Sequence, residues 1–219
     1  MVTEPLFRVD NMRSPLWRSP LRVAAKRFVD VICSGLLLVV LSPILFLLAL
    51  TVKITSRGPI FYRWRVAGKE GHPFVGYKFR SMVADADQLK SRLLSRNEMT
   101  GPVFKLTLDP RITRLGAWMR RYSLDELPQL YSVLIGDMSL VGPRPPLVTE
   151  FDQFSAFQKQ KLSVKPGITC LWQVSGRNQV HDLDEWVRLD LKYISEWSLA
   201  LDARILLLTV REVLRGSGK

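Results

Sequence analysis

The sequence is poor in cysteine, histidine and acidic residues, and each shortage excludes a class of protein. Its 219 residues include only 2 cysteines, which excludes a disulfide-rich scaffold, and no Cys/His cluster has the spacing of a zinc site. The 2 histidines stand far apart, so histidine-based catalysis is not favoured. Asp and Glu number 20 against 32 Lys and Arg, and the net charge of +12 points to a polyanionic partner such as nucleic acid or an anionic membrane.

Apolar residues, in contrast, are plentiful. They make up 47% of the chain, which excludes intrinsic disorder and is enough for one or two folded domains. The positive charge is concentrated at the start. Residues 1–80 hold 13 Lys and Arg against 4 Asp and Glu, whereas the remaining residues hold 19 against 16.

The longest uncharged run, residues 31–52, lies in this basic first third. As a straight helix it would measure roughly 33 Å, enough to cross a bilayer core. Pro43 follows Ser42 in its middle, and because proline cannot donate to the Val39 carbonyl, the helix should break there.

Basic residues flank the run on both sides, whereas a spanning helix usually carries them toward one end. We therefore expect a re-entrant membrane helix over residues 26–54, broken at Ser42-Pro43, with both ends in the cytosol. A kinked spanning helix is the alternative. Asp30 and Arg27 stand on one turn near the membrane surface, where we expect them to form an ion pair.

Residues 1–25 alternate prolines with arginines. This pattern predicts an extended basic arm lying on anionic headgroups, and a solvated tail is an equal alternative. Residues 55–219 are expected to form a catalytic domain at the cytosolic surface of the membrane.

A β-hairpin is predicted after the membrane segment, where two strand-like stretches flank the loop AGKEGH. Folding the chain symmetrically about Lys69-Glu70 pairs Arg65 with Phe74. The alternation of side chains then places four basic residues on one face. They are Arg63, Arg65, Lys78 and Arg80. Such a face could bind lipid phosphate, a sugar nucleotide or only water.

The other predicted elements are helical. Residues 83–97 form a polar helix, the segment after DPRIT a basic helix, and the segment from Leu183 an amphipathic helix capped by Asp182 or Asp184. Residues 199–214 are apolar but too often interrupted by charge to span a membrane, so an interfacial helix is expected. The fold class is therefore α+β and mainly helical, with interfacial amphipathic helices around a cytosolic catalytic site.

The segment RRYSLDELPQL holds the most informative residues, Asp125 and Glu126. Ser123 and Glu126 have capping-box spacing, and Asp125 could be the N-cap instead, so either reading places both carboxylates at a helix N-terminus. Capping alone would explain a lone pair. Arg120 precedes this pair, however, and the proline-flanked Arg144 follows it. Carboxylates beside arginines suggest a site for a diphosphate and a divalent metal.

These segments together resemble the bacterial sugar transferases, the monotopic polyprenyl-phosphate phosphoglycosyl transferases. The resemblance rests on KRFVD, Ser42-Pro43, GPIFYRWRVAGKEGHPFVGYKFRSM, DPRITRLGAWMRRYSLDELPQL, GDMSLVGPRPP, VKPGITCLWQVSGRN and LDLKYISEWS. It covers the chain from about Lys26 to its end. One departure is Cys170, which stands where glycine is expected after KPGIT.

The resemblance implies transfer of a sugar-1-phosphate from a UDP-sugar to polyprenyl (undecaprenyl) phosphate, with release of UMP. It implies a re-entrant helix, Mg²⁺ as cofactor, and the cytosolic face of the bacterial inner membrane, with its anionic lipids, as the location. The reaction initiates exopolysaccharide or glycoconjugate synthesis. The sugar is a hexose or an N-acetylated aminosugar, with a mild preference for the hexose. We expect the chain to be the catalytic unit alone, without nucleic acid as partner and with homo-oligomerisation open.

Residue roles also follow from the resemblance. Asp125 matches the nucleophile, which forms a covalent phosphosugar intermediate and contacts the metal, and Glu126 matches its acidic partner. The remaining positions are expected to bind substrate: Arg120, Pro143, Arg144, Pro145, Lys78, Arg80, Asn178 and Asp190. The competing class is a non-enzymatic, membrane-tethered basic binding module, which would leave the SLDELPQL and GPRPP segments without a role.

Overall fold

The computed structural model describes residues 14–176, 180 and 182–218, and it is mainly helical, as predicted. The helices are α1 (Pro20–Val40), α2 (Ser42–Thr55), α3 (Ala86–Leu93), α4 (Arg114–Arg121), α5 (Gln129–Ile135), α6 (Val148–Phe151), α7 (Ala156–Lys159), α8 (Leu171–Val174), α9 (Leu183–Glu196) and α10 (Leu199–Arg215). The 3₁₀ turns are η2 (Pro15–Arg18), η3 (Lys69–Gly71), η4 (Leu94–Arg96), η5 (Leu124–Glu126) and η6 (Gln160–Ser163). The strands are β1 (Phe61–Ala67), β2 (Pro73–Phe79), β3 (Ser139–Val141) and β4 (Gly167–Thr169).

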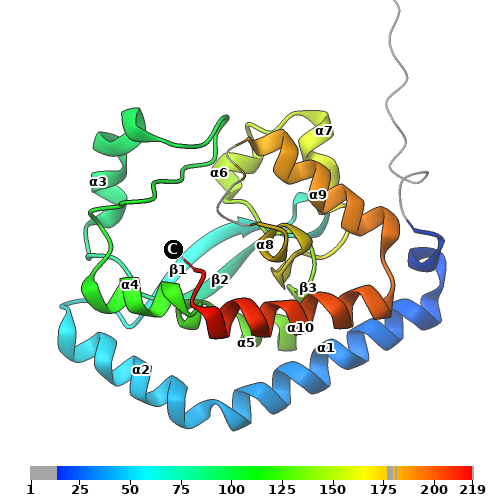
Figure 1. Ribbon diagram of the computed structural model, residues 1–219, viewed down its shortest axis with the longest axis horizontal. Coiled ribbons are helices and arrows are strands. Elements are labelled where there is room, and N and C mark those ends of the chain that lie inside the picture. The colour runs from blue at the N-terminus through cyan, green and yellow to red at the C-terminus, as the bar shows by residue number, and fades with distance from the viewer. Residues whose placement is uncertain (1–13, 177–179, 181, 219) are drawn as a thin grey trace, which may run out of the picture.

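Helices α1 and α2 form a wide V along one edge of the molecule, with the rest of the chain on its inner side (Figure 1). The two helices meet at Leu41 with a bend of 62°, so the predicted break at Ser42-Pro43 is confirmed. Pro43 lies in the first turn of α2, where its missing N–H is not needed. The Ser42 hydroxyl donates to the Val39 carbonyl at 2.8 Å, which replaces the bond that Pro43 cannot make.

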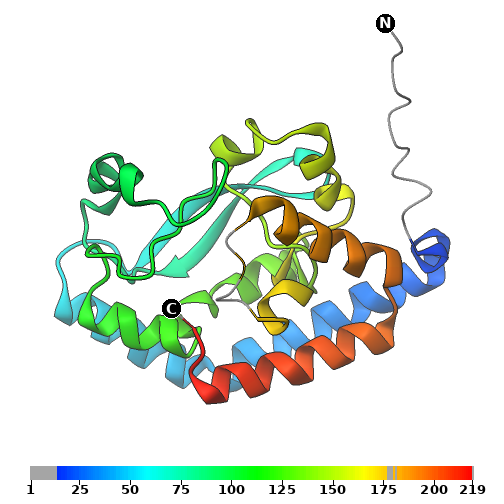
Figure 2. The same cartoon turned by 45° about the horizontal axis from the view of Figure 1, so that its top comes forward.

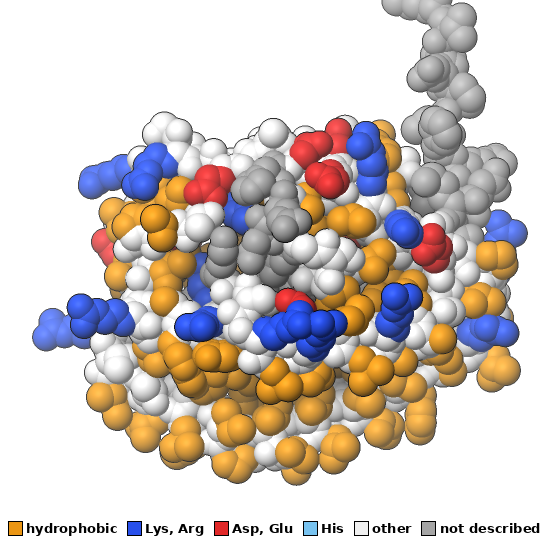
Figure 3. Space-filling view, in the orientation of Figure 1, with side chains coloured by type: hydrophobic (Ala, Val, Ile, Leu, Met, Phe, Trp, Pro, Cys, Tyr) orange, Lys and Arg blue, Asp and Glu red, His pale blue; other side chains and the backbone are white. Residues whose placement is uncertain are grey.

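The outer surface of this V is apolar. Within the described part of the chain no single helix is long and apolar enough to cross a membrane, but α1 and α2 together pass that test as a bent pair. Figure 3 shows hydrophobic side chains gathered along the V and a row of Lys and Arg along the upper border of this region. Exposed apolar residues of the pair include Leu36, Val39, Val40, Phe46, Leu47 and Ile54.

Helix α1 is fixed to the domain by three charged residues on its inner side, Lys26, Arg27 and Asp30. Lys26 forms an ion pair with Asp202 of α10 at 2.7 Å. Arg27 donates to the carbonyls of Val133 and Leu134 in the last turn of α5. Asp30 accepts hydrogen bonds from the Ser139 hydroxyl and from the Leu140 amide, both in β3. The predicted Arg27–Asp30 ion pair is therefore wrong, because both side chains satisfy polar groups of the domain instead.

The predicted extended arm is also wrong for residues 14–25, and residues 1–13 lie outside the described residues. Pro15 and Pro20 each stand in the first turn of a helix, where proline is tolerated. Trp17 stacks on Trp197 with ring centroids 3.9 Å apart and donates to the Ile194 carbonyl at 3.0 Å. This segment thus packs on the end of α9.

Strands β1 and β2 form the predicted antiparallel hairpin, but its register is shifted by one residue. Arg65 pairs with Val75, and Lys78 pairs with Tyr62. The expected grouping of four basic residues on one face is therefore wrong, since Lys78 and Arg80 lie on the face opposite to Arg63 and Arg65. The cause is the odd length of the loop, residues 68–72, which contains Glu70 at a φ of 58°. A shift of one residue turns every side chain to the other face.

A second small sheet, absent from the prediction, joins β3 to β4 in parallel. Its strands approach so closely at Gly142 and Gly167 that a Cβ on Gly167 would lie 2.0 Å from the Gly142 nitrogen. Both glycines are thus required by packing.

The predicted C-terminal helices are confirmed in position. Helix α9 is capped by Asp182 and buries its apolar face in the main core, which contains Trp186, Tyr193 and Trp197. Helix α10 runs beside α1 (Figures 1 and 2) and buries Asp202 and Ile205. Its outer side exposes Leu207, Val210 and Leu214 together with Arg204 and Arg211. This surface has the composition expected of an interfacial helix.

Candidate active site

Two adjoining cavities of about 330 Å³ and 320 Å³ lie between the hairpin, the segment 81–111 and the segment 144–150. Their shared walls include Tyr62, Trp64, Arg120, Arg144 and Glu150, so we describe them as one cleft. The first part extends toward Lys161, Trp172 and Trp186 and is called the aromatic part. The second contains Lys78, Asp125 and Glu126 and is called the acidic part.

Asp125 and Glu126 lie in the 3₁₀ turn η5 and not at an α-helix N-terminus. Helix α5 begins at Gln129, so the predicted helix cap at Ser123 or Asp125 is wrong. Ser123 adopts a left-handed conformation with a φ of 53°, which turns the chain sharply after α4. The turn buries both carboxylic residues to 7% exposure while they line the cleft.

Glu126 binds two of the predicted substrate-binding cations. Its Oε1 atom accepts from Lys78 Nζ at 2.7 Å and from Arg144 Nη2 at 3.2 Å. Burial lowers the pKa of Lys78, and the charge of Glu126 opposes this effect only in part. Burial also acts to lower the pKa of Arg144, but Glu126 and other anionic neighbours outweigh it, so the pKa is raised. Lys78 further lies over the ring of Trp64, 4.1 Å from its centroid.

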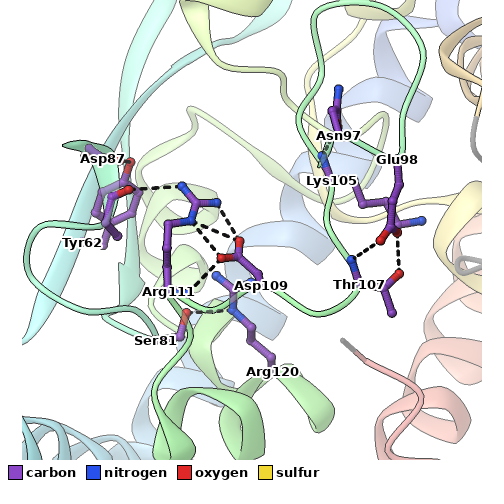
Figure 4. Close-up of polar contacts among 11 residues, drawn as sticks. Tyr62, Ser81, Asp87, Asn97, Glu98, Lys105, Thr107, Asp109, Arg111 and Arg120 are labelled. Atoms are coloured by element: carbon purple, nitrogen blue, oxygen red, sulfur yellow. Dashed lines mark hydrogen bonds and ion pairs between the residues drawn. The ribbon is translucent and has the colours of Figure 1, made fainter. Parts of the chain in front are cut away.

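Arg120 reaches the same cleft from the end of α4. Its Nε donates to the Ser81 hydroxyl at 2.9 Å, as Figure 4 shows. Burial lowers its pKa, against the charges of Asp125 and Asp109. Asp109 itself is bound by Arg111 through Nε and Nη2, the latter at 2.6 Å, so this carboxylate serves to hold Arg111.

The segment 97–109 forms one wall of the aromatic part, a role that the sequence did not predict. Asn97 and Glu98 shape it by binding backbone groups (Figure 4). The Asn97 Oδ1 accepts from the amide of Lys105 at 2.8 Å, and the Glu98 carboxylate accepts from the amide and hydroxyl of Thr107. These bonds order a segment that has no helix or strand.

The GPRPP segment crosses from β3 into the cleft. Gly142 donates to the Thr169 carbonyl, and the Pro143 carbonyl accepts from Gly167, both at 3.0 Å. Sheet β3–β4 thus holds the segment rigidly, with Arg144 and Pro145 lining the cleft.

Two predicted substrate-binding residues, Arg80 and Asp190, make structural contacts, and a third is not described. Arg80 lines the acidic part, but its guanidinium donates to the carbonyls of Ser56 and Arg57 and so holds the end of α2. Asp190 is fully buried and forms an ion pair with Lys161 at 2.7 Å. Burial raises the Asp190 pKa, against the attraction of Lys161. Asn178 lies outside the described residues.

Several cleft residues were missed from the sequence. They are Tyr62, Trp64, Arg111, Glu150, Lys161, Trp172 and Trp186. Arg111 lies in the DPRIT segment, which carried a usable signal, but Lys161 lies in the polar stretch QKQKL, where nothing separates it from a surface lysine. Its burial and its partner Asp190 appear only in the fold.

The expected Mg²⁺ site can be compared with the donor atoms of the cleft. No group of three or more Asp, Glu, His or Cys side chains that could hold a metal occurs in the described ranges. Glu126 is bound by Lys78 and Arg144, whereas Asp125 lines the same part of the cleft. This donor set fits a Mg²⁺ ion that takes one carboxylate from the protein and completes its shell with phosphate oxygens and water.

The comparisons with known proteins identify the class of this protein. A family model described as bacterial sugar transferase matches residues 21–216, and the chain belongs to this family. The predicted family is therefore confirmed.

Individual relatives are more specifically named. The chain is 49% identical over 194 residues to the galactosyl transferase CpsE of Streptococcus agalactiae, covering 89% of this chain and 43% of that protein. It is 43% identical over 198 residues to the undecaprenyl-phosphate galactose phosphotransferase of Salmonella typhimurium, covering 88% of this chain and 41% of that protein. The exopolysaccharide production protein ExoY of Rhizobium meliloti is 37% identical over 203 residues, covering 91% of this chain and 89% of that protein. The chain thus spans less than half the length of the first two relatives and most of the third.

Proposed function

We propose that the protein transfers a sugar-1-phosphate from a UDP-sugar to undecaprenyl phosphate and releases UMP, as the initiating step of exopolysaccharide synthesis. The observation that carries this proposal is the cluster in the acidic part of the cleft, where Asp125 and Glu126 lie with Lys78, Arg120 and Arg144. Three half-buried cations beside two carboxylates suit a diphosphate that is attacked by a carboxylate. The names of the relatives support the same reaction.

The reaction is proposed to take two steps. In the first, a carboxylate oxygen of Asp125 attacks the phosphorus that carries the sugar, an O–P bond forms, and the bond to the UMP oxygen breaks. In the second, an oxygen of the lipid phosphate attacks the same phosphorus and releases Asp125. Arg120 and Arg144 hold the phosphate oxygens, and Glu126 keeps Lys78 and Arg144 in place.

A divalent metal belongs to this proposal as well. Asp125 would hold Mg²⁺ together with phosphate oxygens of the donor. When bound, the ion would neutralise part of the charge of the diphosphate. The residues of the chain position the donor and supply the nucleophile.

The bent pair α1–α2 is proposed to insert into the inner membrane as a re-entrant segment. The cleft would then lie on the cytosolic face of that membrane. The apolar outer surface of the pair and the exposed apolar side of α10 support this placement. Arginines on α10 would face anionic headgroups. The donor sugar is proposed to be a hexose, because relatives are named for galactose and glucose.

The test is UMP release from a panel of UDP-sugars, with undecaprenyl phosphate and Mg²⁺ supplied, followed by mass spectrometry of the protein. We expect wild type with a UDP-hexose alone to carry a phosphosugar on Asp125 and to release UMP before the lipid is added. Asp125→Asn should show neither, because it lacks the nucleophile. UMP release that waits for the lipid would indicate direct displacement, and no turnover with any sugar nucleotide would favour the binding module.

A further inference from the structure

Glu150 is a further carboxylate residue of the cleft, and the proposed reaction gives it no part. It lines both the aromatic and the acidic part. Three cations line the same cleft: Lys90 of α3, Arg144 of the GPRPP segment and Lys161 of η6. Burial raises the pKa of Glu150, and these three cations oppose the effect. A cleft built for the diphosphate alone would gain nothing from a carboxylate here, because the two groups repel each other.

The position of Glu150 is fixed by the fold. Its Oε2 accepts from the Leu147 amide at 3.0 Å, which holds the side chain against the start of α6. The preceding residue, Pro146, accepts a hydrogen bond from Ala67 of β1 at 3.0 Å, so α6 is tied to the hairpin. The carboxylate is thus presented by a rigid support.

Two other carboxylates of the cleft already have side-chain donors. Asp109 is bound by Arg111, and Glu126 is bound by Lys78 and Arg144. Glu150 receives a backbone amide on Oε2, and among the described residues no hydrogen-bond donor reaches its Oε1. It therefore retains an acceptor for a ligand inside the cleft.

We propose that Glu150 accepts a hydrogen bond from a hydroxyl of the sugar nucleotide and so contributes to the choice of donor. This inference rests on the proposed function. Hydroxyls are the donor groups that a sugar nucleotide offers in number, whereas its phosphates accept only. They come from two sources, the ribose and the transferred hexose.

The variant Glu150→Gln tests this role while preserving the support of α6, because the amide oxygen of glutamine can still accept from Leu147. Asp152→Asn is the matched control, since Asp152 is an exposed carboxylate at the C-cap of α6. Both variants should unfold at the wild-type temperature. If Glu150 had only a structural role, Glu150→Gln would change neither the affinity nor the KM for the UDP-sugar.

We expect Glu150→Gln to raise the KM for the UDP-sugar roughly tenfold or more, because a hydrogen bond to a charged acceptor is lost. The kcat should change little, since the contact is made before and during the reaction alike. The control Asp152→Asn should keep the wild-type KM. An unchanged KM in Glu150→Gln would overturn the inference.

Deoxy compounds then locate the hydroxyl. Calorimetry with UMP, 2′-deoxy-UMP and 3′-deoxy-UMP tests the ribose, and kinetics with UDP-hexoses lacking single hydroxyls tests the hexose. In one of the two series, wild type should bind or use the compound that lacks the bound hydroxyl more weakly, by the same factor as the effect of Glu150→Gln. The variant Glu150→Gln should show no further loss with that compound. Equal losses in both proteins across both series would overturn the inference.

The two proposals can fail separately. Absence of both UMP binding and turnover in wild type would refute the proposed function. Normal UMP binding and turnover in wild type, together with unchanged behaviour of Glu150→Gln, would refute only the role of Glu150.

Discussion

The substitution Lys26→Met should destabilise the protein strongly, because Lys26 is one of three donors to a buried carboxylate. Its Nζ lies 2.7 Å from Asp202 Oδ2 and 3.0 Å from the Val141 carbonyl. The side chains of Lys26 and Asp202 are only 9% and 10% exposed, so solvent screens the pair little. Trp197 Nε1 and the Tyr193 hydroxyl also donate to Asp202.

The magnitude follows from what remains after the change. Without Lys26, the single proton of the Tyr193 hydroxyl cannot serve both Asp202 and Val141, and the buried Asp202 charge loses its cation and keeps only neutral donors, Tyr193 and Trp197. Removal of one partner of a buried ion pair costs about 3–5 kcal/mol. For a chain of this size that corresponds to a fall in Tm of roughly 6–20 °C.

The assay is thermal and denaturant unfolding of the full chain in detergent micelles. Lys192→Met, at an exposed position of α9, is the control and should stay within about 0.5 kcal/mol of wild type. Lys26→Met combined with Asp202→Asn should recover at least about 1 kcal/mol of the loss, since no uncompensated buried charge remains. A loss below about 1 kcal/mol in Lys26→Met would refute this reasoning.

The protonation of Lys78 and the close approach at Gly167 give two further tests. Because burial lowers the pKa of Lys78, activity should fall with rising pH before an ordinary lysine would lose its proton, and Lys78→Arg should move this limb of the pH profile to higher pH. Identical profiles would contradict the role of Lys78. Gly167→Ala should destabilise the chain by roughly 2–3 kcal/mol in denaturant unfolding, because its Cβ would collide with backbone atoms. The control Gly35→Ala meets only ordinary contact at 3.7 Å and should not be destabilised.

The sequence predicted those features that local chemistry decides. The break at Pro43 follows from a missing N–H, and the cap of α9 follows from a side-chain oxygen at Asp182. The clustering of Glu126 with Lys78 and Arg144 was predicted through the family resemblance, although these residues are far apart in the chain.

Features that depend on loop conformation or on contacts between distant residues could not be predicted from the sequence. The hairpin register changed with one loop residue, because Glu70 adopts a left-handed conformation that its residue type rarely takes. Trp17 became part of a structured segment because it finds Trp197, 180 residues away in sequence, as a stacking partner. Lys161 gained its position in the cleft through its buried ion pair with Asp190, and Glu150 gained its position because the start of α6 is tied to the hairpin.

The anchoring of the bent pair limits how its length can change. Lys26 fixes α1 to the domain before the bend, and Arg80 fixes the end of α2 after it, where Gly58 at a φ of +124° leaves room for the guanidinium. One residue inserted into either helix would rotate everything beyond it by about 100° and advance it by about 1.5 Å. The length of the bent pair is therefore fixed by its two anchors. Only insertions of close to a whole number of helical turns would keep both anchoring contacts in place.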